Sequence, residues 1–236
     1  MPRGRIKSLP SGYRALVVGA SGGIGAAAAE LLRDEPGCGG VETLSRRDDG
    51  LDLTEEGTIA AAAERLRDGT PFDLVFDATG ALTIDGIGPE KTIRVLDPQA
   101  MAKQFAVNAI GPALIFKHFL PLLRRDRRAV FATLSARVGS IGDNRLGGWI
   151  SYRASKAALN QIVRTTAIEA ARTHPQAVIA ALHPGTVTTP LSEPYSAGRE
   201  RLSPDHSARM LLDVLDGLQP AQSGRFFAYD GSAIEW

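Results

Sequence analysis

Short apolar runs alternate along the chain with longer stretches in which Ala, Leu, Arg and Glu predominate. The short runs have the length and composition of β-strands and cover residues 15–19, 41–45, 50–53, 74–77, 129–134, 178–183 and 225–229. The longer stretches predict helices over residues 23–34, 55–68, 98–124, 149–173 and 204–218. Strands that alternate with helices need crossover connections. The pattern therefore predicts an α/β fold, a doubly wound parallel sheet of about seven strands with helices on both faces.

The chain contains no linker, internal repeat or low-complexity block, so we expect a single domain over residues 1–236. Two longer segments, 135–148 and 186–203, are dense in Gly, Pro and Ser and follow predicted strands. Open α/β sheets bind ligands beyond the carboxyl ends of their strands, and long loops inside a compact domain are usually functional. We therefore expect a ligand site at these two loops.

The composition narrows the classes of function. The 27 Lys and Arg residues against 26 Asp and Glu give a net charge of +1, which argues against a nucleic-acid partner. Cys38 is the only cysteine and the four histidines are scattered, so we expect no disulfide, no metal site and a reducing, cytoplasmic location. Because no window holds 18 uninterrupted apolar residues, we expect no membrane-spanning helix and no membrane partner.

A glycine-rich loop follows the first predicted strand and opens the first predicted helix. Its spacing is G-x-x-x-G-x-G. The first glycine permits a tight turn, the second lets the backbone approach a pyrophosphate, and the third allows helix and sheet to pack closely. This arrangement predicts a Rossmann-like dinucleotide site with contacts from Gly19, Ser21, Gly22, Gly23, Ile24 and Gly25.

The end of the second predicted strand carries Ser45, Arg46 and Arg47, where an acidic residue would bind the ribose of NAD. Two guanidinium groups match a 2′-phosphate, so NADP(H) is favoured. NAD(H) stays possible because carboxylates follow directly. Asp52, with Leu53 beside it, can contact the adenine or cap the next helix.

Tyr152 and Lys156 lie four residues apart at the start of a predicted helix, which places both side chains on one face. A free phenol has a pKa of about 10, and an adjacent ammonium stabilises the phenolate and lowers that pKa. The pair therefore indicates acid–base chemistry near neutral pH. By itself, the same spacing also fits an interfacial tyrosine beside a solvated lysine.

The glycine loop followed by Tyr-x-x-x-Lys resembles the classical short-chain dehydrogenase/reductase family. The resemblance covers essentially the whole chain, because further landmarks fall in order: Asn108, then Pro184-Gly185 with Val187 and Thr189, then Tyr229-Asp230-Gly231. The run 139–141, with the glycines at 147–148, is similar to the carbonyl reductase and C-factor branch.

The resemblance implies roles for individual residues. Tyr152 would protonate a carbonyl oxygen or deprotonate an alcohol, and Lys156 would lower the tyrosine pKa and hold the nicotinamide ribose. Asn108 would fix a water that links Lys156 to solvent; the alternative is an amide that only kinks its helix. Further cofactor contacts would come from Ala78, Thr79, Gly80, Pro184, Gly185, Val187 and Thr189.

The chain departs from the family pattern in three places. The family's Asn-Asn-Ala-Gly is replaced by the residues at 77–80. The second of the paired serines, which is catalytic in the family, is Ala136 here, so Ser135, Ser140 or Tyr152 alone would have to hold the oxyanion; we favour Ser135. Ile150 stands where relatives often have an aromatic residue near the substrate.

These observations favour an NADP(H)-dependent oxidoreductase that acts on a small-molecule carbonyl or secondary alcohol. The alternative is a cofactor-binding regulatory or signalling protein with little turnover. An extended-branch epimerase or dehydratase is disfavoured because only 84 residues (236 − 152) follow Tyr152. Segment 188–203, with Pro190, Leu191, Pro194 and Tyr195, predicts a substrate lid. The resemblance implies a homodimer or homotetramer packed through the helices of Asn108 and Tyr152, with Ala154, Ala157 and Ala158 at the contact.

Overall fold

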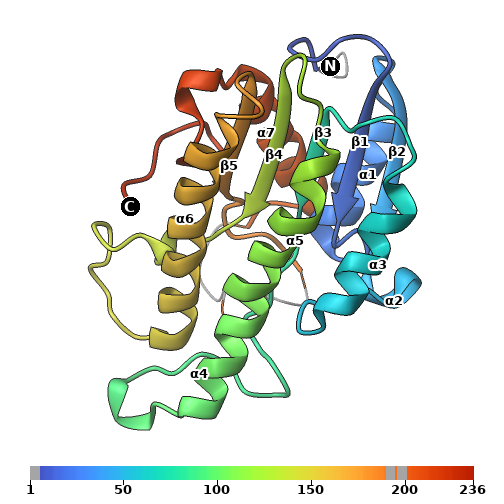
Figure 1. Cartoon of the computed structure of the whole chain (residues 1–236). Helices are drawn as coiled ribbons and strands as arrows, with labels where there is room; N and C mark the ends of the chain where they lie inside the picture. The colour runs from blue at the N-terminus through green and yellow to red at the C-terminus, as the bar shows by residue number, and fades with distance from the viewer. Residues whose placement is uncertain (1–5, 190–194, 196–200) are drawn as a thin grey trace.

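A single parallel sheet forms the centre of the computed structural model, which describes residues 6–189, 195 and 201–236 (Figure 1). Its strands are β1 (Tyr13–Val18), β2 (Cys38–Leu44), β3 (Leu74–Asp77), β4 (Ala129–Leu134), β5 (Ala177–His183) and β6 (Arg225–Ala228). They lie in the order β2-β1-β3-β4-β5-β6. The strand order reverses between β1 and β3, which is the point where doubly wound sheets bind nucleotides.

Helices cover both faces of the sheet. The helices are α1 (Gly23–Arg33), α2 (Arg46–Asp49), α3 (Glu56–Leu66), α4 (Pro98–Phe105), α5 (Gly111–Phe119), α6 (Ile150–Ala170) and α7 (Pro204–Gly217). In Figure 1, α3, α5 and α6 lie in front of the sheet, and α1 and α7 lie behind it. Each face encloses its own apolar cluster, so the central strands β3, β4 and β5 are buried on both sides, as is typical of parallel sheets, while the edge strand β2 is partly exposed. The predicted fold class is confirmed.

The predicted strand at residues 50–53 is wrong, and the sheet described here has six strands. Ser45 caps a single helical turn by accepting a hydrogen bond from the Asp48 amide. Gly50 ends that turn in a left-handed conformation at φ 68°, and the Leu51 amide then donates to the Ser45 carbonyl. These local hydrogen bonds reverse the direction of the chain, so Leu51 and Leu53 lie in a loop and not in a strand.

The predicted helix at 98–124 is present but changes its hydrogen-bonding pattern in the middle. Residues Ala106–Ile110 form a π-helical turn between α4 and α5, and a short 3₁₀ turn follows α5. Pro98–Leu122 is the one helical stretch among the described residues that is long and apolar enough to cross a membrane by length and composition alone. Its buried residues Ile115, Phe116 and Phe119 pack into the core in front of the sheet.

Candidate active site

The glycine loop joins β1 to α1 at the carboxyl end of the sheet. Gly19 has φ +83°, and a Cβ atom there would lie 3.0 Å from the Ala78 carbonyl carbon. A Cβ on Gly25 would overlap the Gly19 carbonyl, and one on Gly23 would lie 2.8 Å from Thr189 Cγ2. Gly19 and Gly25 therefore require glycine, whereas a side chain at Gly23 would need the Thr189 methyl group to shift. No side chain caps the start of α1, so its first amides are available to an anion.

Ser45, Arg46 and Arg47 follow β2 directly, and the Gly19 amide donates to Leu44 at the end of that strand. The two arginines lie on α2, so they flank the glycine loop. Arg47 contacts Asp48 at 2.9 Å in an exposed ion pair, which contributes little stability and leaves the guanidinium free to exchange partners.

Asp52 and Leu53 are occupied by local contacts. Asp52 Oδ1 accepts hydrogen bonds from the Thr54 amide and hydroxyl at 2.8 and 2.7 Å. These bonds close a local turn before α3, whose N-cap residue is Glu55, so the Asp52 side chain does not cap that helix. Leu53 packs against α5, because a Cβ on Gly111 would lie 2.7 Å from Leu53 Cβ.

The segment after β3 lies between the glycine loop and α6. Asp77 is fully buried and accepts hydrogen bonds from the Thr133 hydroxyl at 2.6 Å and from the Thr79 amide at 3.0 Å. Gly80 has φ +138°, and a Cβ there would lie 3.1 Å from Asn108 Oδ1 and 3.2 Å from Lys156 Nζ. The structure thus brings together residues that the sequence separates by up to 76 positions (156 − 80).

Asn108 is buried in the π-helical turn. Its amide nitrogen donates to the Ala81 carbonyl and to Gln104 Oε1, and its oxygen accepts from the Ala81 amide. The side chain therefore holds both the turn and the loop after β3. A π-turn of this kind is frequent at functional sites.

Lys156 extends from α6 into the interior and donates to the Leu134 carbonyl at 2.9 Å. Burial lowers the pKa of Lys156 to about 8, partly offset by the negative charge of Asp77. Tyr152 lies one turn earlier on the same helix, and burial raises its pKa. This is the opposite of the lowering expected from Lys156, and it keeps the phenol protonated at neutral pH.

The hydroxyl groups of the two candidate serines form hydrogen bonds outside the pocket that Tyr152 borders. Ser135 Oγ donates to Asn160 Oδ1 at 2.6 Å, and Asn160 is held in turn by the Gly139 carbonyl. Ser140 Oγ accepts a hydrogen bond from the Asp143 amide. Both serines are buried, and neither lines the pocket next to Tyr152. The structure therefore places the favoured Ser135 against α6, outside the candidate substrate pocket.

A pocket of about 600 Å³ opens in front of Tyr152, within the range of small-molecule sites. Ala136, Trp149 and His183 line it together with Tyr152. The Trp149 ring lies 6.3 Å from the Tyr152 ring, edge to face. The aromatic residue near the substrate is thus Trp149, one position before Ile150.

Arg153 shapes the loop that forms one wall of this pocket. Its guanidinium donates to the carbonyls of Gly148, Val138 and Gly147 at 2.8, 3.2 and 3.1 Å. Because three carbonyls share one planar cation, the loop before α6 is fixed to that helix.

The segment after β5 closes the site from the other side. The Pro184 carbonyl accepts a hydrogen bond from Ser207, and Gly185 has φ +80°. Val187 bridges to Leu202, and the Thr189 side chain lies against Gly23, as the Cβ distance above shows.

Of the predicted lid, Pro190, Leu191 and Pro194 lie outside the described residues. Tyr195 lines the pocket, packs on Trp149 at 5.5 Å and shares a 2.7 Å hydrogen bond with Thr83. One aromatic residue of the lid segment therefore covers the pocket.

Sequence reasoning missed Trp149, Arg153 and His183 as pocket residues. His183 carried the clearest signal, because it directly precedes Pro184-Gly185 at the end of a strand. Among the described residues, no group of three or more His, Cys, Asp or Glu side chains can hold a metal ion.

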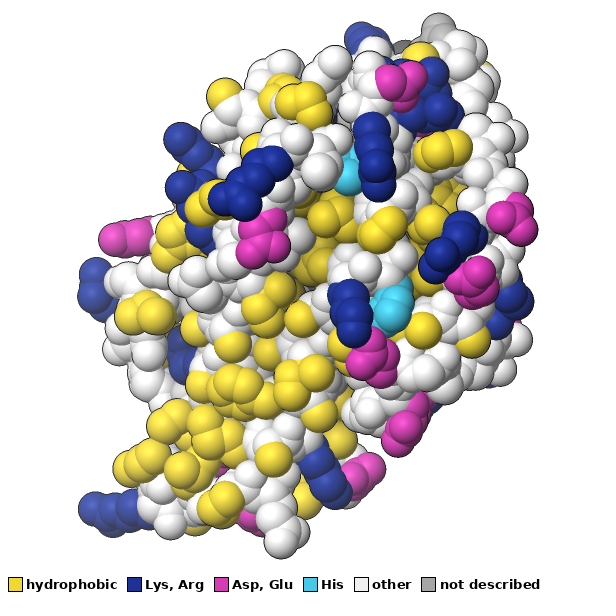
Figure 2. All heavy atoms as spheres, viewed as in Figure 1, with side chains coloured by type: hydrophobic (Ala, Val, Ile, Leu, Met, Phe, Trp, Pro, Cys, Tyr) yellow, Lys and Arg dark blue, Asp and Glu magenta, His cyan; other side chains and the backbone are white. Residues whose placement is uncertain are grey.

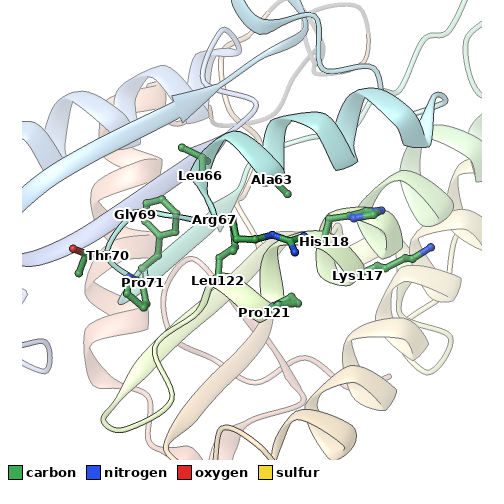
Figure 3. Close-up of a pocket in the computed structure, with 11 residues that line it drawn as sticks. Ala63, Leu66, Arg67, Gly69, Thr70, Pro71, Lys117, His118, Pro121 and Leu122 are labelled. Atoms are coloured by element: carbon green, nitrogen blue, oxygen red, sulfur yellow. The ribbon is translucent and has the colours of Figure 1, made fainter.

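A second cavity, of about 450 Å³, lies between α3 and the end of α5 (Figure 3). Arg67, Lys117 and His118 line it, and Lys117 and His118 both contact Glu56, at 2.6 and 2.9 Å. Phe72 in its wall precedes β3, so this cavity lies at the amino end of that strand. It is remote from the glycine loop, which lies at the carboxyl end.

Comparison with known proteins finds one matching family and several relatives of similar sequence. The profile of a family described as enoyl-(acyl carrier protein) reductase matches residues 44–233. The 1-hydroxy-2-glutathionyl-2-methyl-3-butene dehydrogenase of Rhodococcus sp. (strain AD45) is 32% identical over 79% of each chain. The C-signal protein of Myxococcus xanthus is 38% identical over 60% of this chain and 81% of its own.

Solved structures show the same similarity. The NADPH-bound carbonyl reductase from chicken fatty liver superposes with a TM-score of 0.81 at 26% identity, over 100% of this chain and 98% of its own. A short-chain dehydrogenase/reductase from Burkholderia multivorans with bound NADP gives a TM-score of 0.76 at 29% identity, over 95% and 99%.

Proposed function

Because the chain belongs to the classical short-chain dehydrogenase/reductase family, we propose that it transfers a hydride between NADP(H) and a small-molecule carbonyl or secondary alcohol. The observation that carries the proposal is one arrangement of side chains. Tyr152 borders an apolar pocket, and Lys156 and Asn108 converge on Gly80 beside the glycine loop.

The residues present fit a dinucleotide. The uncapped start of α1, the side-chain-free surface of the glycine loop and the backbone at 78–80 would hold the adenosine and pyrophosphate. Thr79 Oγ1 is buried without a hydrogen-bond partner at this place, so a polar ligand atom would satisfy it. When bound, the cofactor supplies or accepts the hydride.

Tyr152 is the general acid in the direction of reduction. Burial keeps its phenol protonated at neutral pH, so it can deliver a proton to the carbonyl oxygen. Lys156, which lies one turn away and has a pKa of about 8, would hold the ribose hydroxyls and keep a positive charge next to the developing phenolate. Trp149 excludes water from the reacting carbon.

Replacement of Tyr152 by phenylalanine tests the proposed mechanism. The variant keeps the ring and its contact with Trp149 but loses the hydroxyl, so NADPH oxidation across a panel of ketones and aldehydes should be abolished. NADPH binding, measured by calorimetry, should be retained. Full activity in Tyr152→Phe would exclude this tyrosine as the proton donor.

The preference for NADP(H) is supported by Arg46 and Arg47 on α2, next to the glycine loop. Two structural relatives more than a quarter identical were solved with NADPH or NADP. Replacing both arginines with alanine should weaken NADPH binding far more than NADH binding, because only NADPH carries the 2′-phosphate. An unchanged ratio of the two affinities would refute the assignment.

A second candidate function is cofactor binding with little turnover. The C-signal similarity and the alanine at position 136 favour it, since a missing hydrogen-bond donor slows acyl- and carbonyl-type chemistry. Calorimetry with NADPH, followed by the same carbonyl panel, separates the two functions. Tight NADPH binding without oxidation by any carbonyl would support this second candidate.

We further propose that the protein forms a homodimer or homotetramer through α5 and α6. Figure 2 shows apolar side chains gathered over these helices and α4. Ile110, between α4 and α5, is 54% exposed, and Ala154, Ala157 and Ala158 on α6 would permit close approach. Light scattering should give a dimeric or tetrameric mass, and Ile110→Glu should shift it towards the monomer.

A further inference from the structure

The candidate substrate pocket lacks the hydroxyl that would hold a carbonyl oxygen next to Tyr152. Ala136 lies in the pocket wall and has no polar side-chain atom. The hydroxyls of Ser135 and Ser140 are turned to Asn160 and to the Asp143 amide. An oxygen bound against Ala136 would therefore lose a hydrogen bond unless another side chain supplies it.

His183 is the last residue of β5, the strand next to β4. In the β4–β5 pairing, Leu134 is opposite Leu182, and the Ser135 amide donates to the Leu182 carbonyl at 2.8 Å. His183 is therefore level with Ser135, and Ala136 follows one position later. Both Ala136 and His183 are in the wall of the pocket that Tyr152 borders, so the imidazole and the alanine share this pocket.

The imidazole of His183 has no committed partner among the described residues. Its Nδ1 atom is buried and makes no hydrogen bond. The other ring nitrogen, Nε2, also makes no hydrogen bond to a described residue, but it is not fully buried. Nε2 is therefore the nitrogen that a molecule in the pocket can reach. A buried N–H without an acceptor is costlier than a bare ring nitrogen, which favours the tautomer with the proton on Nε2.

The surroundings keep this ring neutral. Burial and the charge of Arg137 lower the pKa of His183, the charge of Asp230 raises it in part, and the resulting pKa is about 4. A neutral imidazole carries one N–H donor. Of the cations that line the pocket, Arg137 pairs with Asp143 at 3.3 Å and Arg153 donates to three carbonyls, while Arg145 is exposed.

We propose that the Nε2–H group of His183 donates a hydrogen bond to the oxygen of the bound carbonyl compound, in the place that Ala136 leaves without a hydroxyl. This inference rests on the proposed function, because it assigns a second donor to the oxygen that Tyr152 protonates. It makes His183 a catalytic residue that contributes to the oxyanion site, and it gives the alanine at 136 a physical explanation.

The test uses a planar aromatic dicarbonyl, isatin, as the probe, because Trp149 and Tyr152 present flat rings to the pocket. His183→Ala should lower kcat/KM for isatin reduction by at least about tenfold and leave NADPH affinity unchanged. Ala136→Ser in the His183→Ala background should recover most of that loss. His183→Gln, which retains an N–H donor, should have a kcat/KM between that of His183→Ala and that of the unmodified protein.

His206→Ala, on the exposed side of α7, is the matched control and should behave as the unmodified protein. A His183→Ala variant within twofold of the unmodified protein in kcat/KM would overturn the inference. So would an equal loss with and without Ala136→Ser. If His183→Ala fails to fold, His183→Phe, which keeps a ring but has no N–H donor, provides the same comparison with and without Ala136→Ser.

Binding of isatin to the complex with NADP⁺ separates this inference from the proposed function, because no hydride can be transferred there. Quenching of tryptophan fluorescence reports binding at Trp149. If the unmodified protein binds isatin but never reduces it, the proposed function fails. The inference then stands only if His183→Ala weakens isatin binding and Ala136→Ser restores it.

Discussion

Replacing Lys156 with methionine should increase the free energy of unfolding at neutral pH, although Lys156 belongs to the candidate active site. The Lys156 residue is 3% exposed, and burial lowers the pKa of its ammonium from 10.5 to about 8. The folded protein thus binds this proton less tightly than the unfolded chain does. Between these two pKa values the unfolded chain carries more protons, so stability rises with pH across that window.

The magnitude follows from the two pKa values. A pKa unit corresponds to about 1.4 kcal/mol, so a lowering from 10.5 to about 8 costs about 3 kcal/mol of stability below pH 8. Methionine has a similar length and no charge, so its variant avoids that cost. The stability advantage of Lys156→Met over the unmodified protein should therefore shrink by about 3 kcal/mol between pH 7 and pH 10.5.

Urea denaturation of both proteins at several pH values measures this difference, and contributions from other titrating groups cancel in it. Lys103→Met is the control, because it removes an exposed ammonium that forms a surface ion pair with Asp85. A stability difference for Lys156→Met that stays constant with pH would contradict a buried ammonium at this position.

Two further variants test the supports of the site. Gly80→Ala should lower the free energy of unfolding by about 1–3 kcal/mol and reduce activity, because φ +138° suits glycine alone and the added Cβ would press on Asn108 and Lys156; urea denaturation and NADPH oxidation measure the two effects, and an unchanged stability would contradict the strained geometry. Arg153→Lys should lower kcat/KM while NADPH affinity stays constant, since the single nitrogen of an ammonium cannot reach all three carbonyls that the three guanidinium nitrogens contact; equal kinetics would show that this anchor does not shape the pocket.

Most of the fold and the nucleotide loop could be predicted because their signals are local. Alternating apolar runs determine the strands, and the spacing of Gly19, Gly23 and Gly25 reports one strand–turn–helix unit. The error at residues 50–53 has a local cause as well. The Ser45 cap and the left-handed conformation of Gly50 favour a helical turn. A strand prediction based on apolar residues alone takes neither effect into account.

The pocket could not be predicted in the same way because its walls come from distant segments. Ala136 follows β4, Trp149 precedes α6 and His183 ends β5, and only the packing of these three elements brings the residues together. The orientation of Ser135 depends on Asn160, which is 25 positions later in the chain. A motif indicates which residue types are present, whereas a hydrogen bond formed across the fold decides which of them face the substrate.

Deuterium transfer from labelled NADPH tests the proposed hydride transfer most directly. A carbonyl that the protein reduces should be incubated separately with NADPH deuterated at each of the two hydrogens of nicotinamide C4, and the alcohol product analysed by mass spectrometry. A site that holds the nicotinamide by one face should place deuterium on the carbinol carbon with one label and not with the other. Product without deuterium from either label would contradict hydride transfer in this pocket.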